Sequence, residues 1–224
     1  IFTLFLLLNY PFISLSVASD YYFEGQTGSY DLDNVETARS DGTIGSTTFS
    51  NFGASLDYDE DSAIGFELGK YFSNNFRVGL SYTNLNMDFE TGTISSDVTV
   101  QQGSDSIDGS ISLSFSPSDA NSVGIEFSNH ADLVLLKAYY EFDPINNIVP
   151  YLGFGIGQAD IEKAIDKESV KTFMIGANYK FNSSNGYAGI RFSTMEVDGP
   201  VDRLGISYQD IDLDAFELII GTKF

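Results

Sequence analysis

Three side chains that can act together in nucleophilic catalysis alternate along one short segment: Ser128, His130 and Asp132. A serine, a histidine and an aspartate activate a nucleophile when each side chain hydrogen-bonds to the next. Alternate residues on a strand lie about 7 Å apart, so these side chains cannot bond directly to one another without help from a neighbouring strand. We therefore interpret His130, the single histidine of the chain, as an isolated residue at the rim of a sheet, and we predict no catalytic residue.

Glycines occupy every second position between residues 153 and 157, where the sequence reads Gly-Phe-Gly-Ile-Gly. A dinucleotide-binding loop has the spacing G-x-G-x-x-G and opens a helix. The spacing here has a period of two, which is typical of a strand. The glycines therefore predict free space on one face of a sheet, and we expect no nucleotide and no other cofactor.

Carboxylates that could bind a hard cation gather in two places. The two clusters are Asp57, Asp59, Glu60 and Asp61, and Asp210, Asp212 and Asp214. Calcium and magnesium prefer several oxygen ligands of this kind, but the first cluster lacks the spacing and the glycine of an EF-hand loop. We interpret both clusters as solvated charges that bind divalent ions weakly, with Asp57, Asp59 and Asp61 as candidate ligands, and we predict no specific metal site.

Apolar residues alternate with small or polar residues throughout the chain after residue 20, and this period of two predicts strands rather than helices. A length of 224 residues fits a single domain of this kind. The alternation predicts eight strands, of which the first is the least regular. They cover about 21–32, 64–72, 76–83, 132–142, 150–159, 172–181, 187–197 and 215–224.

The two faces of these strands differ in side-chain size, and this difference indicates their environment. One face carries aliphatic and aromatic residues, whereas the other carries mostly Gly, Ala, Ser, Thr and Asn with a few charges. In a soluble sandwich the second face would carry long charged side chains to water. Small residues instead fit the narrow interior of a barrel whose bulky face points into lipid. We predict an all-β, eight-stranded antiparallel up-and-down transmembrane β-barrel, in preference to a soluble sandwich or a lipocalin-type barrel.

Short and long connections alternate between the predicted strands. The short ones are residues 73–75, about five residues around Pro144, and 182–186; the long ones are about 33–61, 90–131 and 198–210, with a shorter one near 162–169. This asymmetry is typical of outer-membrane barrels, whose turns are periplasmic and whose loops are extracellular. The segments 111–115 and 123–127 alternate as well, which predicts either strand extensions or a hairpin within the second long loop.

The net charge of −21 is concentrated in and beside these connections, because residues 33–61, 90–131, 160–169 and 196–214 together carry a net charge of −19. Such an acidic surface excludes nucleic acid as a partner, because phosphate binding requires basic residues. Eight charged residues are instead predicted to point inward: Glu67, Arg77, Lys137, Glu141, Lys180, Arg191, Glu217 and Lys223. A narrow barrel cannot solvate all of them, so we expect ion pairs that fill the lumen. The alternatives are a narrow ion path and a pair of catalytic glutamates.

The first 19 residues, IFTLFLLLNYPFISLSVAS, combine an apolar run with small residues at Ser16, Ala18 and Ser19. The run is too short to span a bilayer, and the small residues fit recognition by a signal peptidase. We expect residues 1–19 to be a signal peptide whose amino end is truncated, and residues 20–224 to form the barrel domain. Because the chain has no cysteine, disulfides and thiol catalysis are excluded.

The segment 149–157, with the sequence VPYLGFGIG, resembles the PY-x-G-x-G-x-G strand of the OmpA/OmpX-like and opacity-type small outer-membrane barrels, a group that includes surface antigens. Residues 65–69 and 76–82 resemble the second hairpin of that family. The last predicted strand is similar to the carboxy-terminal signal that the barrel-assembly machinery recognises in such proteins. The residues that carry this signal are Phe216, Leu218, Ile220 and Phe224.

This resemblance implies a protein of the Gram-negative outer membrane, surrounded by lipid and lipopolysaccharide. It implies a structural or surface-interaction role, in which the loops act as a surface antigen or adhesin and contact a host or cell-surface ligand. Two other roles stay open. One is a small porin or ion-conducting barrel, and the other is a lipid A-modifying enzyme that would use Ser128, His130 and Asp132.

Overall fold

The computed structural model of the protein describes residues 21–59, 61–122, 127–182 and 185–224, except for the side chain of Asp61. The expected signal peptide, residues 1–19, lies outside the described residues. Among the helices that are described, none has the length and apolarity needed to cross a membrane.

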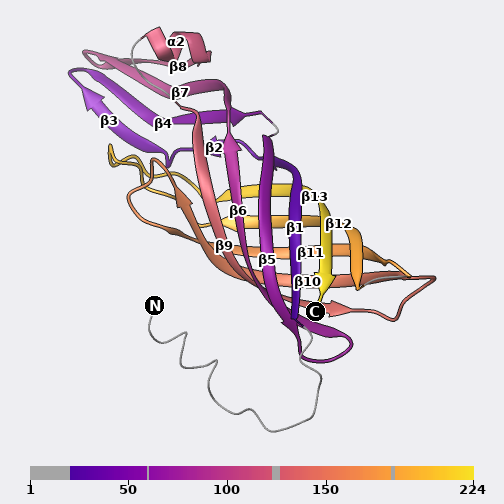
Figure 1. Ribbon diagram of the computed structural model, residues 1–224. Helices are drawn as coiled ribbons and strands as arrows, with labels where there is room; N and C mark the ends of the chain where they lie inside the picture. The colour runs from indigo at the N-terminus through magenta and orange to yellow at the C-terminus, as the bar shows by residue number, and fades with distance from the viewer. Residues whose placement is uncertain (1–20, 60, 123–126, 183–184) are drawn as a thin grey trace.

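Eight strands form a closed barrel (Figure 1). They are β1 (Tyr21–Leu32), β5 (Asp61–Tyr71), β6 (Phe76–Met87), β9 (Asn129–Glu141), β10 (Ile148–Ile161), β11 (Glu168–Lys180), β12 (Gly186–Val197) and β13 (Ile211–Lys223). All pairings are antiparallel, and β1 pairs with β13 from Tyr22 opposite Lys223 to Leu32 opposite Leu213. This last pairing closes the barrel, so no strand edge is left to face lipid. The predicted fold is confirmed, although several strands extend further toward the long loops than the alternation indicated.

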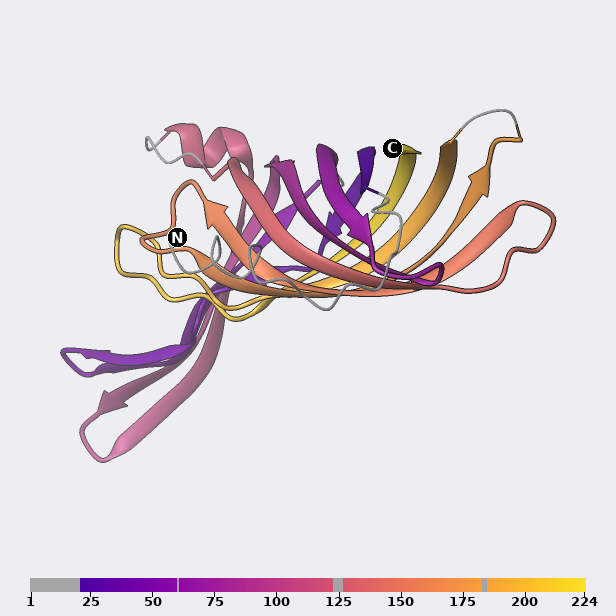
Figure 2. The same ribbon diagram turned by 60° about the horizontal axis from the view of Figure 1, so that its bottom comes forward.

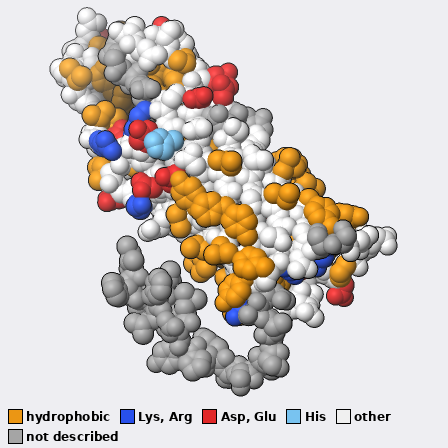
Figure 3. All heavy atoms as spheres, viewed as in Figure 1, with side chains coloured by type: hydrophobic (Ala, Val, Ile, Leu, Met, Phe, Trp, Pro, Cys, Tyr) orange, Lys and Arg blue, Asp and Glu red, His pale blue; other side chains and the backbone are white. Residues whose placement is uncertain are grey.

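Alternation divides the side chains of the barrel into an outward and an inward set. Outward residues such as Ile64 and Leu218 are 69% and 52% exposed, and Figure 3 shows hydrophobic side chains gathered on the barrel wall. Outward aromatic residues surround the end of the barrel that carries the short turns. They are Tyr21, Phe72, Phe76, Tyr140, Phe142, Tyr179, Phe181 and Phe224. Such a girdle is typical of the boundary between lipid and water.

Charged side chains return to the outer face at the opposite end of the barrel. Lys171 on β11 lies 2.8 Å from Glu196 on β12, and both side chains are about half exposed. Asp214 also faces outward, at the start of β13. The apolar stretch of β13 between Phe216 and Phe224 matches the length that a tilted transmembrane strand needs, about 9–11 residues.

The two longest connections fold into a second sheet beyond the barrel (Figure 2). Its strands are β2 (Val35–Glu36), β3 (Ser40–Ile44), β4 (Thr47–Tyr58), β7 (Phe89–Gln102) and β8 (Asp105–Phe115), and helix α2 (Pro117–Ser122) follows. Strand β4 pairs with β7, so the first connection is joined to the second. Gly103, at φ +69°, turns β7 into β8. The alternating segment 111–115 therefore belongs to a loop hairpin, whereas residues 123–126 lie outside the described part of the chain.

Candidate functional site

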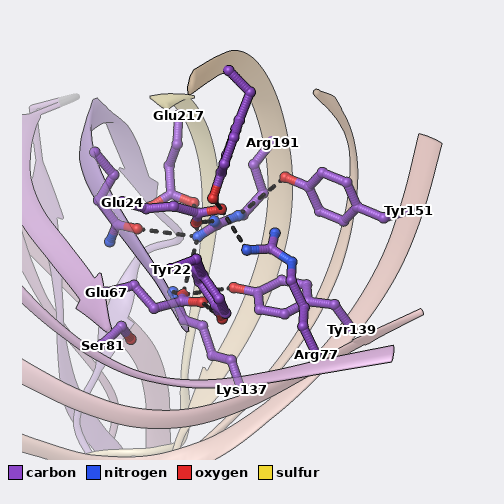
Figure 4. Close-up of polar contacts among 12 residues, drawn as sticks. Tyr22, Glu24, Glu67, Arg77, Ser81, Lys137, Tyr139, Tyr151, Arg191 and Glu217 are labelled. Atoms are coloured by element: carbon purple, nitrogen blue, oxygen red, sulfur yellow. Dashed lines mark hydrogen bonds and ion pairs between the residues drawn. The ribbon is translucent and has the colours of Figure 1, made fainter. Parts of the chain in front are cut away.

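The interior of the barrel contains a buried network of charged and tyrosine side chains (Figure 4). Six of the eight residues predicted to point inward are at most 2% exposed: Glu67, Arg77, Lys137, Glu141, Arg191 and Glu217. Lys180 and Lys223 also point inward, but they are only partly buried, near the short turns. The alternation of each strand is what directs these side chains into the lumen.

Arg191 on β12 contacts several strands across the lumen. Its Nη2 atom lies 2.9 Å from Oε2 of Glu24, and its Nη1 atom lies 3.4 Å from Oε2 of Glu217. Nη1 also donates a hydrogen bond of 3.1 Å to Oε1 of Gln26. All of these partners are buried. In such surroundings the attraction between opposite charges is strong, and a charge that loses its partner is costly.

Arg77 on β6 lies between carboxylates and aromatic rings. Its Nη1 atom pairs with Glu24, and its Nε atom lies 3.2 Å from Oε1 of Glu141. The guanidinium carbon is 4.1 Å from the ring centroid of Tyr139 and 4.6 Å from that of Tyr22. Cation–π contacts of this kind are strongest when they are shielded from water. Arg77 therefore joins β6 to both β1 and β9.

Tyrosine hydroxyls donate to each of the four buried glutamates. The hydrogen bonds run from Tyr187 to Glu24 (2.9 Å), from Tyr22 and Tyr139 to Glu67 (2.5 and 2.7 Å), from Tyr71 to Glu141 (2.7 Å) and from Tyr30 to Glu217 (2.7 Å). Hydrogen bonds to an ionised acceptor are about twice as strong as those between neutral groups. The tyrosines therefore hold the buried glutamates in place within the lumen.

Three lysines add positive charge around this network. Nζ of Lys137 lies 3.8 Å from Glu67, and Nζ of Lys180 lies 3.9 Å from Glu141. Nζ of Lys223 lies 3.3 Å from the ring centroid of Tyr71. Charges of both signs thus link strands across the barrel, and these side chains fill the half of the lumen nearest the short turns.

Glu24 is a member of the network that sequence reasoning missed, although it contacts both arginines. It lies in β1, whose alternation is the least regular because glycines and polar residues occur on both faces. The signal that could have found it is the even-numbered series Tyr22, Glu24, Gln26 and Tyr30, which alternates with the outward Phe23.

Four inward glycines lie directly opposite tyrosines on neighbouring strands. The pairs are Tyr22–Gly69, Tyr139–Gly153, Tyr151–Gly176 and Tyr187–Gly221. A Cβ atom on any of these glycines would come within 2.4–2.6 Å of its tyrosine. At Gly153 the predicted free space is therefore occupied by an aromatic ring, as it is at the other three glycines, and the expectation of a mainly small interior face is incomplete. The glycines make room for large neighbours, as in other sheets where an aromatic ring covers a glycine.

The three candidate catalytic side chains bond to separate partners. Nδ1 of His130 lies 3.0 Å from Oε2 of Glu162, whereas Asp132 accepts a hydrogen bond of 2.7 Å from the hydroxyl of Tyr82. Oγ of Ser128 accepts from a backbone amide at 3.3 Å. These contacts do not form a chain from serine to histidine to aspartate.

Two of the three candidate cation ligands have described side chains, and neither belongs to a metal-binding group. Asp57 lies near the end of β4 and Asp59 follows it, whereas the side chain of Asp61 lies outside what the structure describes. Across the described ranges, no group of three or more His, Cys, Asp or Glu side chains is placed to hold a metal ion.

Three residues of the predicted assembly signal lie on the outer face of β13, and the fourth, Phe224, directly follows the strand. Phe216, Leu218, Ile220 and Phe224 are all exposed, and the backbone amide of Phe224 donates to the carbonyl of Tyr21 at 2.9 Å. Their side chains are thus directed toward lipid and away from the network. Their recognition during assembly stays a prediction.

Comparisons with known proteins agree with this architecture. Residues 16–224 match the model of the outer membrane protein beta-barrel domain family. Neisserial surface protein A is 9% identical, with a TM-score of 0.54 over 91% of this chain and 97% of that one. OprG from Pseudomonas aeruginosa is 16% identical, with a TM-score of 0.48 over 92% of this chain and 96% of that one.

AlkL, another outer membrane protein, is 15% identical, with a TM-score of 0.48 over 96% of this chain and 95% of that one. No curated protein matches the sequence. The likeness to Neisserial surface protein A shows a shared fold and nothing finer, whereas the family match covers nearly the whole chain. The chain therefore belongs to the outer membrane protein β-barrel family and is a protein of the bacterial outer membrane.

Proposed function

We propose that this protein presents its second sheet and its loops at the cell surface, and that the barrel is a closed anchor that neither conducts ions nor catalyses a reaction. The observation that carries the proposal is the division of the chain into a barrel whose lumen is crossed by buried charged side chains and a folded sheet beyond it (Figure 2). Loops on a rigid scaffold are where binding specificity usually resides. The partners that we propose are a host or cell-surface ligand at the loops, lipid and lipopolysaccharide around the barrel, and the barrel-assembly machinery during insertion.

The filled lumen supports the closed barrel. Glu24, Arg77 and Arg191 are 0% exposed, and both arginines contact Glu24 in the interior. An eight-stranded barrel is narrow enough for side chains to fill it. Ions could pass only if these paired charges separated, which would leave each of them without a partner in a dry environment.

The β7–β8 hairpin supports a role in recognition. Ile107, Ile111 and Leu113 of β8 are all more than half exposed, and they lie on one face of the strand because they are separated by even numbers of residues. Contiguous apolar side chains on a surface are typical of interaction sites. This hairpin is therefore the part of the chain that we expect to contact a ligand.

The placement of the histidine supports a role without catalysis. His130 contacts Glu162, and Asp132 is bonded to Tyr82, so the histidine and the aspartate serve different neighbours. A nucleophile and its base must hydrogen-bond to each other in a catalytic constellation. For this reason we do not propose the lipid A-modifying activity.

Planar-bilayer recordings of the refolded protein are expected to show no steady conductance, because paired side chains fill the lumen. The control is a gel in which the unboiled protein migrates differently from the boiled protein, which establishes that the sample is a folded barrel. Reproducible open-channel steps from such a sample would contradict the proposal and favour a small porin.

Thiol labelling tests which end of the barrel faces the medium. The chain has no cysteine of its own, so Ser104→Cys in the β7–β8 turn and Asn74→Cys in the β5–β6 turn each provide one exposed thiol. A membrane-impermeant maleimide is expected to label Ser104→Cys on intact cells, and Asn74→Cys only after the outer membrane is permeabilised. The opposite pattern would place the second sheet in the periplasm and refute surface presentation.

A further inference from the structure

An apolar cavity of about 250 Å³ lies in the half of the barrel nearest the long loops. The inward side chains change from charged to apolar in this direction along several strands. On β13 the series runs from Glu217 to Leu213 and Ile211, and on β1 it runs from Glu24 to Leu32. The charged network therefore forms the floor of the cavity, and apolar residues form its walls.

The walls come from six strands of the barrel, and loop residues line the partly open top. Buried wall residues are Leu32, Leu85, Leu133, Val197, Ile211 and Leu213. Tyr58, Pro200 and Tyr208 contribute from the connections above. A cavity of about 150 Å³ with apolar walls already stays dry and binds benzene. A larger apolar cavity offers few hydrogen-bond partners to water, so it favours an apolar occupant.

Two basic side chains line the same cavity at its loop end, Lys163 and Arg203. Their segments lie side by side, since the amide of Arg203 donates to the carbonyl of Lys163 at 3.3 Å. Nη2 of Arg203 donates to the carbonyl of Glu162 at 3.0 Å, and Nζ of Lys163 donates to the carbonyl of Ser128. Backbone carbonyls thus hold both cations at the cavity, in a part of the chain where acids predominate.

The remaining polar groups at this end of the cavity are already engaged or neutral. Asp202 accepts the amides of its own loop at residues 204 and 206, and the hydroxyl of Tyr208 at 3.2 Å. Burial raises the pKa of Tyr58 to about 12, and burial together with Asp202 raises the pKa of Tyr208. Both phenols are therefore uncharged at neutral pH, and the cationic groups that line the cavity are Lys163 and Arg203.

We infer that the cavity binds a single-chain amphiphile with an anionic head group, of the fatty-acid class. The acyl chain fills the space between the apolar walls, and the carboxylate lies beside Arg203 and Lys163 at the loop end. A sugar or a peptide does not fit, because the walls supply almost no hydrogen-bond partners. The site is separate from the exposed β7–β8 hairpin, so this inference goes beyond the surface role proposed above and does not depend on it.

Photo-crosslinking tests the site. The refolded protein in lipid nanodiscs is incubated with a twelve-carbon fatty acid that carries a diazirine near its methyl end, irradiated and digested for mass spectrometry. Crosslinks are expected at inward residues such as Leu85, Leu133 and Leu213, and unlabelled dodecanoate is expected to compete. Crosslinks confined to lipid-facing residues such as Leu136 and Leu218, or labelling without competition, would overturn the inference.

Binding of the acyl chain and binding of the head group are tested separately, the first with two phenylalanine variants and the second with two competitors. Ala159→Phe fills the cavity from β10 and is expected to reduce labelling at least tenfold, whereas the matched variant Gln158→Phe, on the outer face of the same strand, is expected to leave it unchanged. Arg203→Glu, at an exposed position, is expected to weaken competition by dodecanoate but not by neutral dodecanol. Equal labelling of the two phenylalanine variants, both folded by gel mobility, would refute the cavity. If dodecanoate competes equally well with and without Arg203→Glu, the proposed role of the head group is refuted.

Discussion

Arg191→Met is expected to lower the free energy of unfolding by about 3–5 kcal/mol, because removing one partner of a buried ion pair leaves the other charge uncompensated. Arg191 contacts Glu24 at 2.9 Å and Glu217 at 3.4 Å, and all three side chains are buried. Methionine has a similar length but no charge, so both carboxylates would lose a cation in a lumen that water does not reach. The measurement is urea unfolding of the protein in detergent micelles, followed by the fraction that keeps the gel mobility of the folded barrel.

The chain provides a matched control on its outer wall. Lys171 pairs with Glu196 at 2.8 Å, a distance close to that of the interior pair, but both side chains are about half exposed. Exposed pairs contribute about 0–1 kcal/mol, so Lys171→Met is expected to change stability little. Adding Glu24→Gln to Arg191→Met removes one of the carboxylates that lost their cation. The free energy of unfolding should therefore fall by less in the double variant than the sum of the decreases in the two single variants. If Arg191→Met lowers the free energy of unfolding no more than Lys171→Met does, the buried network contributes little to stability.

Side-chain alternation was sufficient to predict the barrel. The period of two requires only that successive residues point to opposite faces, and the contrast between bulky and small faces indicates which face meets lipid. Parity alone then directs residues such as Arg77 and Glu217 inward, where the structure has them. Exact strand ends were less predictable, because β9 and β13 continue past the lipid, where selection for apolar outward residues ends.

The partners within the lumen could not be predicted, because pairing across a barrel depends on the register of several strands at once. Glu24 meets Arg77 and Arg191 from strands that are far from it in the sequence. Parity assigns a side chain to the interior, but it does not assign its height or the residue that it faces. The tyrosine–glycine pairs have the same origin, since Tyr187 lies opposite Gly221 only in the register that β12 and β13 adopt.

The second sheet and the apolar cavity also could not be predicted from the alternation of side chains. Strand β4 pairs with β7 through a shifted register, which joins two connections that the sequence shows as separate loops. The cavity is formed by inward residues such as Leu85 and Leu133 together with loop residues such as Tyr208. A sequence with alternating faces indicates that these residues point inward, but the volume they leave depends on how the loops cover them.

Gly221→Val is expected to lower the free energy of unfolding by about 1–3 kcal/mol through overpacking of the lumen. A Cβ atom at Gly221 would lie 2.4–2.6 Å from atoms of the Tyr187 ring, and that ring is 2% exposed. The ring cannot move aside without disturbing the 2.9 Å hydrogen bond from its hydroxyl to Glu24. The same unfolding measurement in micelles detects the loss.

A neighbouring glycine separates overpacking from the general effect of a side chain on a strand. Gly25 faces outward, and a Cβ atom there meets nothing nearer than Ile220 at 3.8 Å, so Gly25→Val is expected to stay within about 0.5 kcal/mol of the wild type. In a Tyr187→Ala background the ring is gone, and Gly221→Val should then cost clearly less than it does alone, since contacting residues are energetically coupled. Equal losses with and without the tyrosine would mean that the glycine is required for its backbone and not for the ring opposite it. The smaller loss in the alanine background would show instead that Gly221 admits the ring of Tyr187, whose hydroxyl then holds the buried carboxylate of Glu24 in place.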